Sequence, residues 1–286
     1  MRATEVTGSV REALAETREM LRVAGVAEAR GEALHLWCAV TGRNPGIDQL
    51  ADDAPADPVF LARLRELVTR RAGGEPLGYV TGTTGFRHLS LFSDRRALIP
   101  RPETEGLVGV ALQCTRNGIA ADVGTGSGAI ALSLRQEGEF SEVIGSDLSP
   151  AALELATLNA GRTGLAVTWL EGDLLAPLGR RQVDLLVSNP PYLTEAEYLA
   201  CDRSVRDYEP ESALVSGPDG MLATRRLLTE GRLVVAPGGW IALEVDCRRA
   251  DMVARLAEEL GWVEVNVLDD LFGRARYVRA QLRNTR

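Results

Sequence analysis

The chain has 286 residues, of which 45% are hydrophobic and 25% charged, and its formal net charge is −8. This length suits one large domain with a small second one, and the acidic balance argues against a broad surface that follows nucleic-acid phosphates. No apolar run approaches the ~18 residues that would cross a membrane. The polar N-terminus lacks a secretory signal region, so we expect a cytoplasmic protein. Two histidines and four scattered cysteines have no metal-ligand spacing, so no metal site is expected.

Residues 1–75 have the pattern of a small helical domain. Apolar or small side chains between residues 10 and 21 recur at spacings of four, three and four, and a second helix is expected over 27–40. Asp57 followed by Pro58 marks the start of a third helix, which a glycine pair ends. Such a module packs against something or binds a partner, and we expect no chemistry from it.

Residues 76–98 differ in composition, since β-branched and aromatic residues alternate with glycine and threonine turns. This pattern predicts a β-hairpin that links the helical domain to the rest of the chain. In the next stretch, "ALIPRPETEG", Pro100 and Pro102 break regular structure and Glu103 is expected to begin a helix. Residues 99–286 then form the third and largest part.

From residue 118 onward, predicted strands and helices alternate. Repeated strand–helix units indicate a mostly parallel, Rossmann-like α/β sheet covered by helices. The last two strands are separated by a short loop and should be antiparallel. The strands are expected over 118–124, 142–147, 166–173, 183–191, 238–246, 263–270 and 275–282.

The stretch "DVGTGSG" lies between a predicted strand and a helix. Its glycines permit a tight turn and let backbone N–H groups approach a ligand, although a turn without any ligand has the same pattern. Asp147 ends the next strand 19 residues after Gly128, where nucleotide-binding sheets carry an acid that takes a ribose hydroxyl. With Asp122 and Asp173, three carboxylates then follow three successive strands along one edge of the sheet.

Two cofactors fit a ribose-binding acid. A dinucleotide requires G-x-G-x-x-G facing a pyrophosphate, whereas this loop is G-x-G-x-G preceded by the carboxylate of Asp122. That negative charge suits a cation, and S-adenosylmethionine carries a sulfonium and an ammonium. The loop resembles motif I of class I methyltransferases and favours S-adenosylmethionine over a dinucleotide.

The fourth strand runs into Asn189-Pro190-Pro191-Tyr192. Methylating a planar nitrogen requires two acceptors that hold the –NH₂ group and direct it at the methyl donor. The side-chain oxygen of Asn189 is one acceptor, and the carbonyl of Pro190, fixed by the restricted φ of proline, is the other. Tyr192 can stack on the flat substrate group. A stiff turn that only ends a strand is the simpler alternative.

The tetrapeptide resembles the [D/N]-P-P-[Y/F/W] signature of amino-methyltransferases that act on adenine, cytosine or protein glutamine. Across most of the chain from about residue 70, the sequence is similar to the release-factor glutamine methyltransferases, the HemK/PrmC family. The similarity rests on these segments, in chain order: "RRAGGEPLGYVTG", "LIPRPETEGLV", "DVGTGSGAIALSL", "SNPPYL", "VRDYEPESALVSGPDG" and "APGGWIALE".

The resemblance implies methyl transfer from S-adenosylmethionine to the glutamine of the Gly-Gly-Gln tip of class I peptide-chain release factors, giving N5-methylglutamine. The helical domain would engage the release factor, and no direct nucleic-acid binding is expected. Asn189, Pro190 and Tyr192 would be catalytic, and substrate would contact Asn189, Pro190, Pro191, Tyr192 and Glu244. The cofactor would contact Asp122, Gly124, Thr125, Gly126, Ser127, Gly128, Asp147, Asp173, Leu174 and Asn189.

One departure and three alternatives remain. The family often has E-x-G-x-x-Q where this chain has Glu244-Val245-Asp246-Cys247-Arg248. A DNA adenine methylase would share N-P-P-Y but needs a base-flipping surface. A non-catalytic module would bind no S-adenosylmethionine. A dehydrogenase would need a catalytic His or a Tyr-Lys pattern, which is missing.

Overall fold

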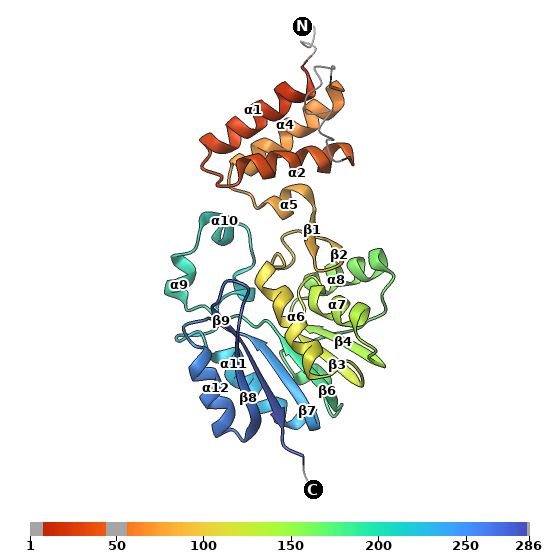
Figure 1. Cartoon of the computed structure of the whole chain (residues 1–286), viewed down its shortest axis with the longest axis vertical. Coiled ribbons are helices and arrows are strands. Elements are labelled where there is room, and N and C mark those ends of the chain that lie inside the picture. Colours follow the sequence, from red (N-terminus) through yellow and green to blue (C-terminus); the bar gives the residue numbers. More distant parts are fainter. Residues whose placement is uncertain (1–7, 44–55, 285–286) are drawn as a thin grey trace. The chain divides into compact units, whose positions relative to one another are not determined.

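The computed structural model describes residues 8–43 and 56–284, which divide into two compact units (Figure 1). One unit contains the described residues up to Gly82 and, in addition, Arg203–Tyr208. The other contains Thr83–Asp202 and the described residues from Glu209 onward. Within 8–43 and 56–284, no helix is long and apolar enough to cross a bilayer.

The first unit is helical, as its periodicity predicts. The side chain of Asp57 accepts a hydrogen bond from the backbone N–H of Val59 at 2.8 Å, which confirms the predicted start of the third helix. Leu21, Leu36 and Leu64 meet in its core. The helices are α1 (Val10–Val23), α2 (Ala29–Thr41), α4 (Pro58–Ala72), α5 (Leu77–Thr81) and α10 (Arg203–Arg206).

The predicted hairpin is present but shorter than expected. Its strands are β1 (Thr83–Phe86) and β2 (Leu89–Phe92), which pair antiparallel, whereas residues 77–81 form the short helix α5. Helix α6 (Pro102–Cys114) begins one residue before the predicted Glu103, because proline needs no N–H partner at the first helical position.

The second unit is built on a seven-stranded sheet of order β5-β4-β3-β6-β7-β9-β8. Its neighbouring strands from β5 to β7 are parallel, and β9 is antiparallel to both of its neighbours, which confirms the predicted α/β class and the antiparallel final pair. The strands are β3 (Ile119–Val123), β4 (Glu142–Asp147), β5 (Thr168–Glu171), β6 (Val183–Ser188), β7 (Val235–Glu244), β8 (Trp262–Asp269) and β9 (Ala275–Leu282).

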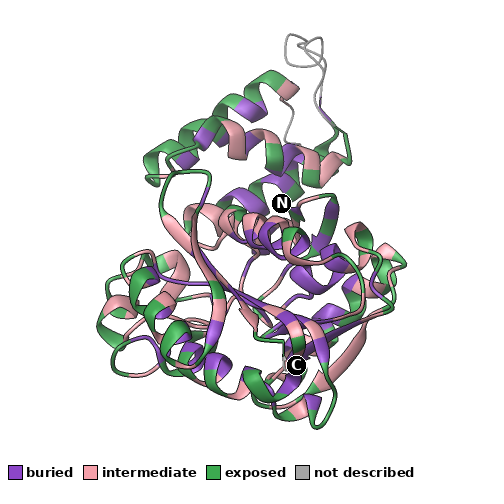
Figure 2. Ribbon diagram, turned by 60° about the horizontal axis from the view of Figure 1, so that its bottom comes forward, coloured by how far each residue is buried: buried purple, intermediate pink, exposed green. Residues whose placement is uncertain are grey.

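Helices cover both faces of this sheet, so its central strands are apolar without alternation. Along β6, Leu185 and Val187 pack with α6 and α7 on one face, and Leu186 packs with α11 and α12 on the other. Figure 2 shows buried residues concentrated along these central strands. The covering helices are α7 (Ala129–Glu137), α8 (Pro150–Thr163), α11 (Leu222–Val234) and α12 (Ala250–Glu259), together with α6.

Strand order reverses beside β3, because β4 follows it on one side and β6 pairs with it on the other. Open α/β sheets bind ligands at the carboxyl ends of the strands at such a reversal. The hydroxyl of Ser188 donates to the carbonyl of Val123 at 2.6 Å and ties the two strand ends together. The glycine loop and the N-P-P-Y turn therefore leave the sheet side by side.

Candidate active site

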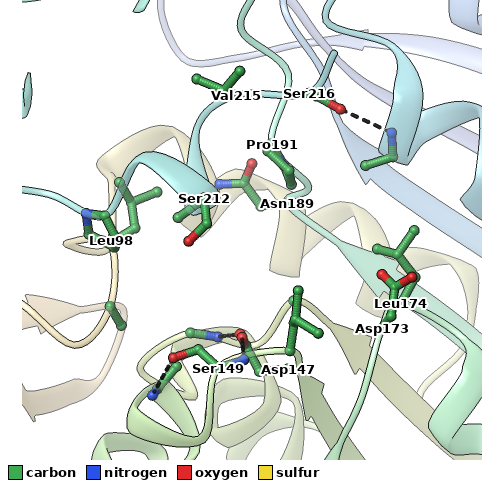
Figure 3. A pocket seen from close by; sticks show the side chains of 18 of the residues that line it. Leu98, Asp147, Ser149, Asp173, Leu174, Asn189, Pro191, Ser212, Val215 and Ser216 are labelled. Atoms are coloured by element: carbon green, nitrogen blue, oxygen red, sulfur yellow. Dashed lines mark hydrogen bonds between the residues drawn. The ribbon is translucent and has the colours of Figure 1, made fainter.

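A cavity of about 410 Å³ lies at this reversal, within the range of ~300–1,000 Å³ of small-molecule sites (Figure 3). Figure 3 shows Asp147 and Ser149 on one wall, Asn189 and Pro191 on the opposite wall, and Leu174 at a third side. The other lining residues include Arg96, Ala97, Leu98, Gly124, Gly126, Leu148, Asp173, Pro210, Ser212, Ala213, Val215, Ser216, Gly217 and Arg226.

The glycine loop bends back over the end of β4. The N–H groups of Gly124 and Thr125 both donate to the carbonyl of Ser146, at 2.8 and 2.9 Å. Gly124 and Gly126 have φ of 73° and 55°, the left-handed region that favours glycine, and both line the cavity. At Gly128, with φ of 83°, a Cβ would also press on neighbouring side chains, so this glycine serves packing rather than the cavity.

Asp147 is held by two backbone hydrogen bonds. Its Oδ2 accepts from the N–H of Gly126 at 2.8 Å, and its Oδ1 accepts from the N–H of Ser149 at 2.9 Å. Each carboxylate oxygen keeps a further lone pair for a ligand donor. Ser149 also caps α8, with Pro150 at the first helical position, as the sequence predicts. The acid at the end of the second sheet strand is thus fixed at the cavity wall.

Asp122 differs from the other two predicted carboxylates, Asp147 and Asp173. It is fully buried beneath the loop and does not line the cavity. Its Oδ2 accepts from the hydroxyl of Thr125 at 2.6 Å and from the N–H of Ala131 at 3.1 Å. Its Oδ1 is buried and finds no partner within 8–43 and 56–284. Burial raises the pKa of Asp122 to about 7. Thr125 and Ser127 are buried as well and do not line the cavity.

Asp173 and Leu174 both line the cavity beyond β5. The carboxylate of Asp173 receives a hydrogen bond from Arg226 at 2.7 Å, and Arg226 also pairs with Glu230 on its own helix. Leu174 has φ of 47°, a strained value for a branched side chain, and this turn presents it to the cavity.

The N-P-P-Y turn places Asn189 and Pro191 on the cavity wall, whereas Pro190 is buried and Tyr192 half-buried away from the lining. The Nδ2 of Asn189 donates to the hydroxyl of Thr104 at 3.0 Å. Neither the Oδ1 of Asn189 nor the carbonyl of Pro190 accepts a hydrogen bond from the described part of the chain. Two adjacent acceptors are therefore available on a stiff turn.

Behind this turn lies Glu244, which is 1% exposed and does not line the cavity. Its Oε2 accepts from the hydroxyl of Thr104 at 2.8 Å, and its Oε1 accepts from the hydroxyl of Tyr192 at 3.5 Å. Burial raises the pKa of Glu244 to about 7, and burial followed by the charge of Glu244 raises the pKa of Tyr192.

Two segments that carry the family resemblance meet beside the turn. The buried carboxylate of Glu209, from "DYEP", accepts from the guanidinium of Arg101 at 2.5 Å and from the N–H of Ile99 at 3.4 Å. The "IPRPETE" segment is thereby held against the segment whose residues 210–217 supply part of the cavity wall. These contacts join residues more than 100 positions apart.

The departure after β7 lies outside the cavity lining. The carboxylate of Asp246 pairs with Arg248 and, at 3.0 Å, with Arg249, and both arginines reach Glu197 at 2.8 Å. These ion pairs connect the end of β7 to helix α9 (Glu195–Leu199). Cys247 is half-buried.

Sequence reasoning missed several residues of the site. Asn159 is fully buried, and its Nδ2 donates to the carbonyl of Ser127 at 2.9 Å and to that of Phe92 at 3.2 Å, so it ties the hairpin to the glycine loop. Thr104 and Arg226 were also missed. Of these three residues, only Thr104 lies in a segment that carries the family resemblance, "LIPRPETEGLV".

The residues around the cavity fit S-adenosylmethionine better than a dinucleotide. The two arginines that line the cavity are each paired with a carboxylate, Arg96 with Asp94 at 2.7 Å and Arg226 with Asp173, so neither is left for a pyrophosphate. Asp122, buried beneath the loop with an unpartnered Oδ1 and a pKa raised to about 7, would ionise more readily beside a cation than beside a pyrophosphate.

Comparison with known proteins agrees with this site. A family model described as "Methyltransferase small domain" matches residues 104–207, and one described as "PrmC N-terminal domain" matches residues 12–82. A methyltransferase structure from Pyrococcus furiosus superposes with a TM-score of 0.53 at 19% identity, covering 69% of this chain and 90% of that one. This likeness supports a class I methyltransferase fold.

Full-length relatives define the family. The chain is 40% identical to a release factor glutamine methyltransferase of Deinococcus radiodurans, over 95% of this chain and 98% of the relative. It is 37% identical to a release factor glutamine methyltransferase of Geobacter sulfurreducens, over 96% of this chain and 97% of the relative. The chain therefore belongs to the release factor glutamine methyltransferase family.

Proposed function

We propose that the chain transfers the methyl group of S-adenosylmethionine to the side-chain amide nitrogen of a glutamine in a peptide-chain release factor. The observation that carries this proposal is a pair of adjacent acceptors without a hydrogen-bond partner in the described chain, namely the Oδ1 of Asn189, which lines the cavity, and the carbonyl of the buried Pro190 next to it. A primary amide has two N–H groups on one nitrogen, and two adjacent acceptors match them.

The chain contributes positioning more than acid–base chemistry. An amide nitrogen is a weak nucleophile because its lone pair is delocalised, so its approach must be well aligned, and alignment can supply ~7–11 kcal/mol at most. The two prolines restrict the backbone of the turn and hold the carbonyl of Pro190 in place. Tyr192 stays neutral, since its pKa is raised, and lies outside the cavity lining with its hydroxyl on Glu244, so it would support the turn from behind.

S-adenosylmethionine supplies an electrophilic methyl group on a sulfonium, a good leaving group. On the side of the chain, Asp147 would accept from ribose hydroxyls, and Leu174 with Asp173 would border the adenine. The backbone of Gly124 and Gly126 would border the methionine part, with the buried carboxyl group of Asp122 behind the loop. Asn189 would lie between cofactor and substrate.

The partner follows from the relatives' names. We assign the substrate to class I release factors, whose Gly-Gly-Gln tip presents a glutamine, and the product is N5-methylglutamine. The helical unit, which the PrmC N-terminal domain matches over 12–82, would engage the body of the release factor. Because release factors act in translation, we place the reaction in the cytoplasm and expect no direct nucleic-acid binding.

The test is methyl transfer from isotopically labelled S-adenosylmethionine to a purified release factor, with the modified residue mapped by mass spectrometry. We expect a single label on the glutamine nitrogen of Gly-Gly-Gln. A release factor with that glutamine replaced by glutamate is the matched control and should stay unlabelled. Label in duplex DNA instead, or on another residue of the release factor, would overturn the proposal.

A further inference from the structure

Thr104 connects two buried or half-buried groups that are far apart in sequence. It lies in the first turn of α6, is 5% exposed, and contacts Asn189 from the end of β6 and Glu244 from the end of β7. The distances are 3.0 Å from its Oγ1 to the Nδ2 of Asn189 and 2.8 Å to the Oε2 of Glu244. We call this chain of hydrogen bonds the Asn189–Thr104–Glu244 relay.

The relay has a direction because a hydroxyl has one proton. A carboxylate offers only acceptors, so the hydroxyl of Thr104 must donate to Glu244. Its lone pairs then face Asn189, and they accept a hydrogen bond only from the NH₂ end of the amide. If the amide of Asn189 were rotated by half a turn, its oxygen would face the hydroxyl oxygen of Thr104. That hydroxyl already donates its one proton to Glu244 and has none left to donate to Asn189. One buried hydrogen bond would be lost.

We propose that Thr104 and Glu244 are positioning residues that hold the amide of Asn189 with its oxygen, not its NH₂ group, free for the substrate. This inference rests on the proposed function, since it explains how the acceptor pair of Asn189 and Pro190 is kept as an acceptor pair. Neither Thr104 nor Glu244 lines the cavity, so both act through Asn189.

The relay also bears on which side chains the site selects. A substrate –NH₂ group is matched by two acceptors, whereas a carboxylate would place its lone pairs against those of Asn189 and Pro190. A rotated Asn189 would present donors, accept a carboxylate and repel –NH₂. The direction of the relay is therefore a device for choosing glutamine over glutamate.

The ionisation of Glu244 sets the direction, and several charged or titratable groups surround it. When Glu244 is protonated, its carboxyl O–H can donate to Thr104, whose own proton is then free to turn toward the oxygen of Asn189. Burial raises the pKa of Glu244 to about 7, so this reversal falls in an accessible range. The groups facing Glu244 are Glu103 on α6, Tyr192 on the turn, and Arg276 and Tyr277 on β9.

The test compares Thr104→Val, which keeps the shape but loses the hydroxyl, with Thr104→Ser, which keeps the hydroxyl. We expect kcat for methylation of the release factor to fall ~10- to 100-fold in Thr104→Val, the range set by one unsatisfied buried hydrogen bond, and to stay within ~3-fold in Thr104→Ser. The Kd for S-adenosylhomocysteine should stay within ~3-fold in both. Thr104→Ala replaces the valine variant if that protein does not fold.

Two further readouts separate positioning from a general structural role. In ¹⁵N-resolved spectra, the side-chain NH₂ resonances of Asn189, assigned by their loss in Asn189→Ala, should shift in Thr104→Val and not in Thr104→Ser. The glutamate-substituted release factor should inhibit the valine variant more strongly than the wild type. Equal kcat in the valine and serine variants, or unmoved Asn189 resonances, would overturn the relay and leave the proposed function standing. A wild type that does not methylate glutamine would instead overturn the proposed function.

Discussion

Asp147 accepts a hydrogen bond from the backbone N–H of Gly126 at 2.8 Å, and this contact couples the end of β4 to the middle of the glycine loop. The same carboxylate lines the cavity. One side chain therefore shapes the loop and faces the ligand, so its removal should affect binding more than chemistry.

Asp147→Ala is expected to raise the Kd for S-adenosylhomocysteine by ~10- to 100-fold, since it removes an acceptor for the ribose and the support of Gly126. Titration calorimetry measures this change directly. Asp219→Ala removes an exposed carboxylate that pairs with Arg225 outside the cavity and is the matched control. An unchanged Kd in Asp147→Ala would contradict the assignment.

Asn189→Ala should nearly abolish methyl transfer and leave cofactor affinity within about tenfold of the wild type. The variant loses the side-chain acceptor on the cavity wall, while the glycine loop and Asp147 are untouched. Single-turnover rates with saturating S-adenosylmethionine, together with calorimetric Kd values, give the two quantities. Turnover comparable to wild type would refute the role of the side chain.

Asp122→Asn should change how stability depends on pH. Burial raises the pKa of Asp122 from 3.8 to about 7, so between pH ~4 and ~7 the unfolded chain releases a proton that the folded chain still holds. The wild type therefore loses stability as pH rises through this window, and above about 7 the loss is constant. The variant lacks this ionisation, so its stability relative to wild type should rise from pH 4 to 7.

Chemical denaturation at pH 4, 5, 6, 7 and 8 measures the difference in the free energy of unfolding. Asp219→Asn is an informative control, because the hydrogen bond from Arg225 lowers the pKa of Asp219 to about 2. The folded and unfolded chains differ in protonation of Asp219 mainly below pH 4, so the stability of this variant relative to wild type should stay nearly flat from pH 4 to 8. A flat difference for Asp122→Asn from pH 4 to 8 would show that Asp122 does not titrate in this window.

Gly145→Ala should destabilise the sheet unit by ~1–3 kcal/mol, the usual cost of overpacking. A Cβ at Gly145 in β4 would overlap the indole of Trp169 in β5 and approach the hydroxyl of Thr125 at 3.0 Å. Gly161→Ala, in α8 with open space around its Cβ, is the matched control and should stabilise by ~0.5–1 kcal/mol. Equal effects on the thermal midpoint would refute the packing argument.

The sequence predicted those features that depend only on neighbouring residues, such as the starts of helices. Asp57 with Pro58, and Ser149 with Pro150, begin helices where expected, because caps depend on residues within one turn. The burial of Asp122 was not predictable in this way. Its position beneath the loop depends on the hydroxyl of Thr125 and the N–H of Ala131, so its carboxyl group lies behind the loop and does not line the cavity.

Most of the features that the sequence did not predict are contacts between segments that are distant in the chain. Thr104 and Glu244 are 140 residues apart, and Arg101 and Glu209 are 108 apart, so no window of the sequence contains either pair. Strand order is equally non-local, because it is set by how the sheet assembles. Residues 77–81 show the reverse failure, where β-branched and aromatic residues predicted a strand and the chain formed a short helix instead.

The assignment of Arg203–Tyr208 to the helical unit has a practical consequence for dissecting the protein. The polypeptide passes between the units three times, after Gly82, after Asp202 and after Tyr208. A fragment that stops at residue 82 would lack residues 203–208, which belong to the helical unit. A fragment that starts at residue 83 would contain these six residues without the helices that they pack with. Cutting the chain at residue 82 is thus a poor way to study each unit separately. A fragment that starts at residue 83 and has a short linker in place of residues 203–208 would contain only the sheet unit.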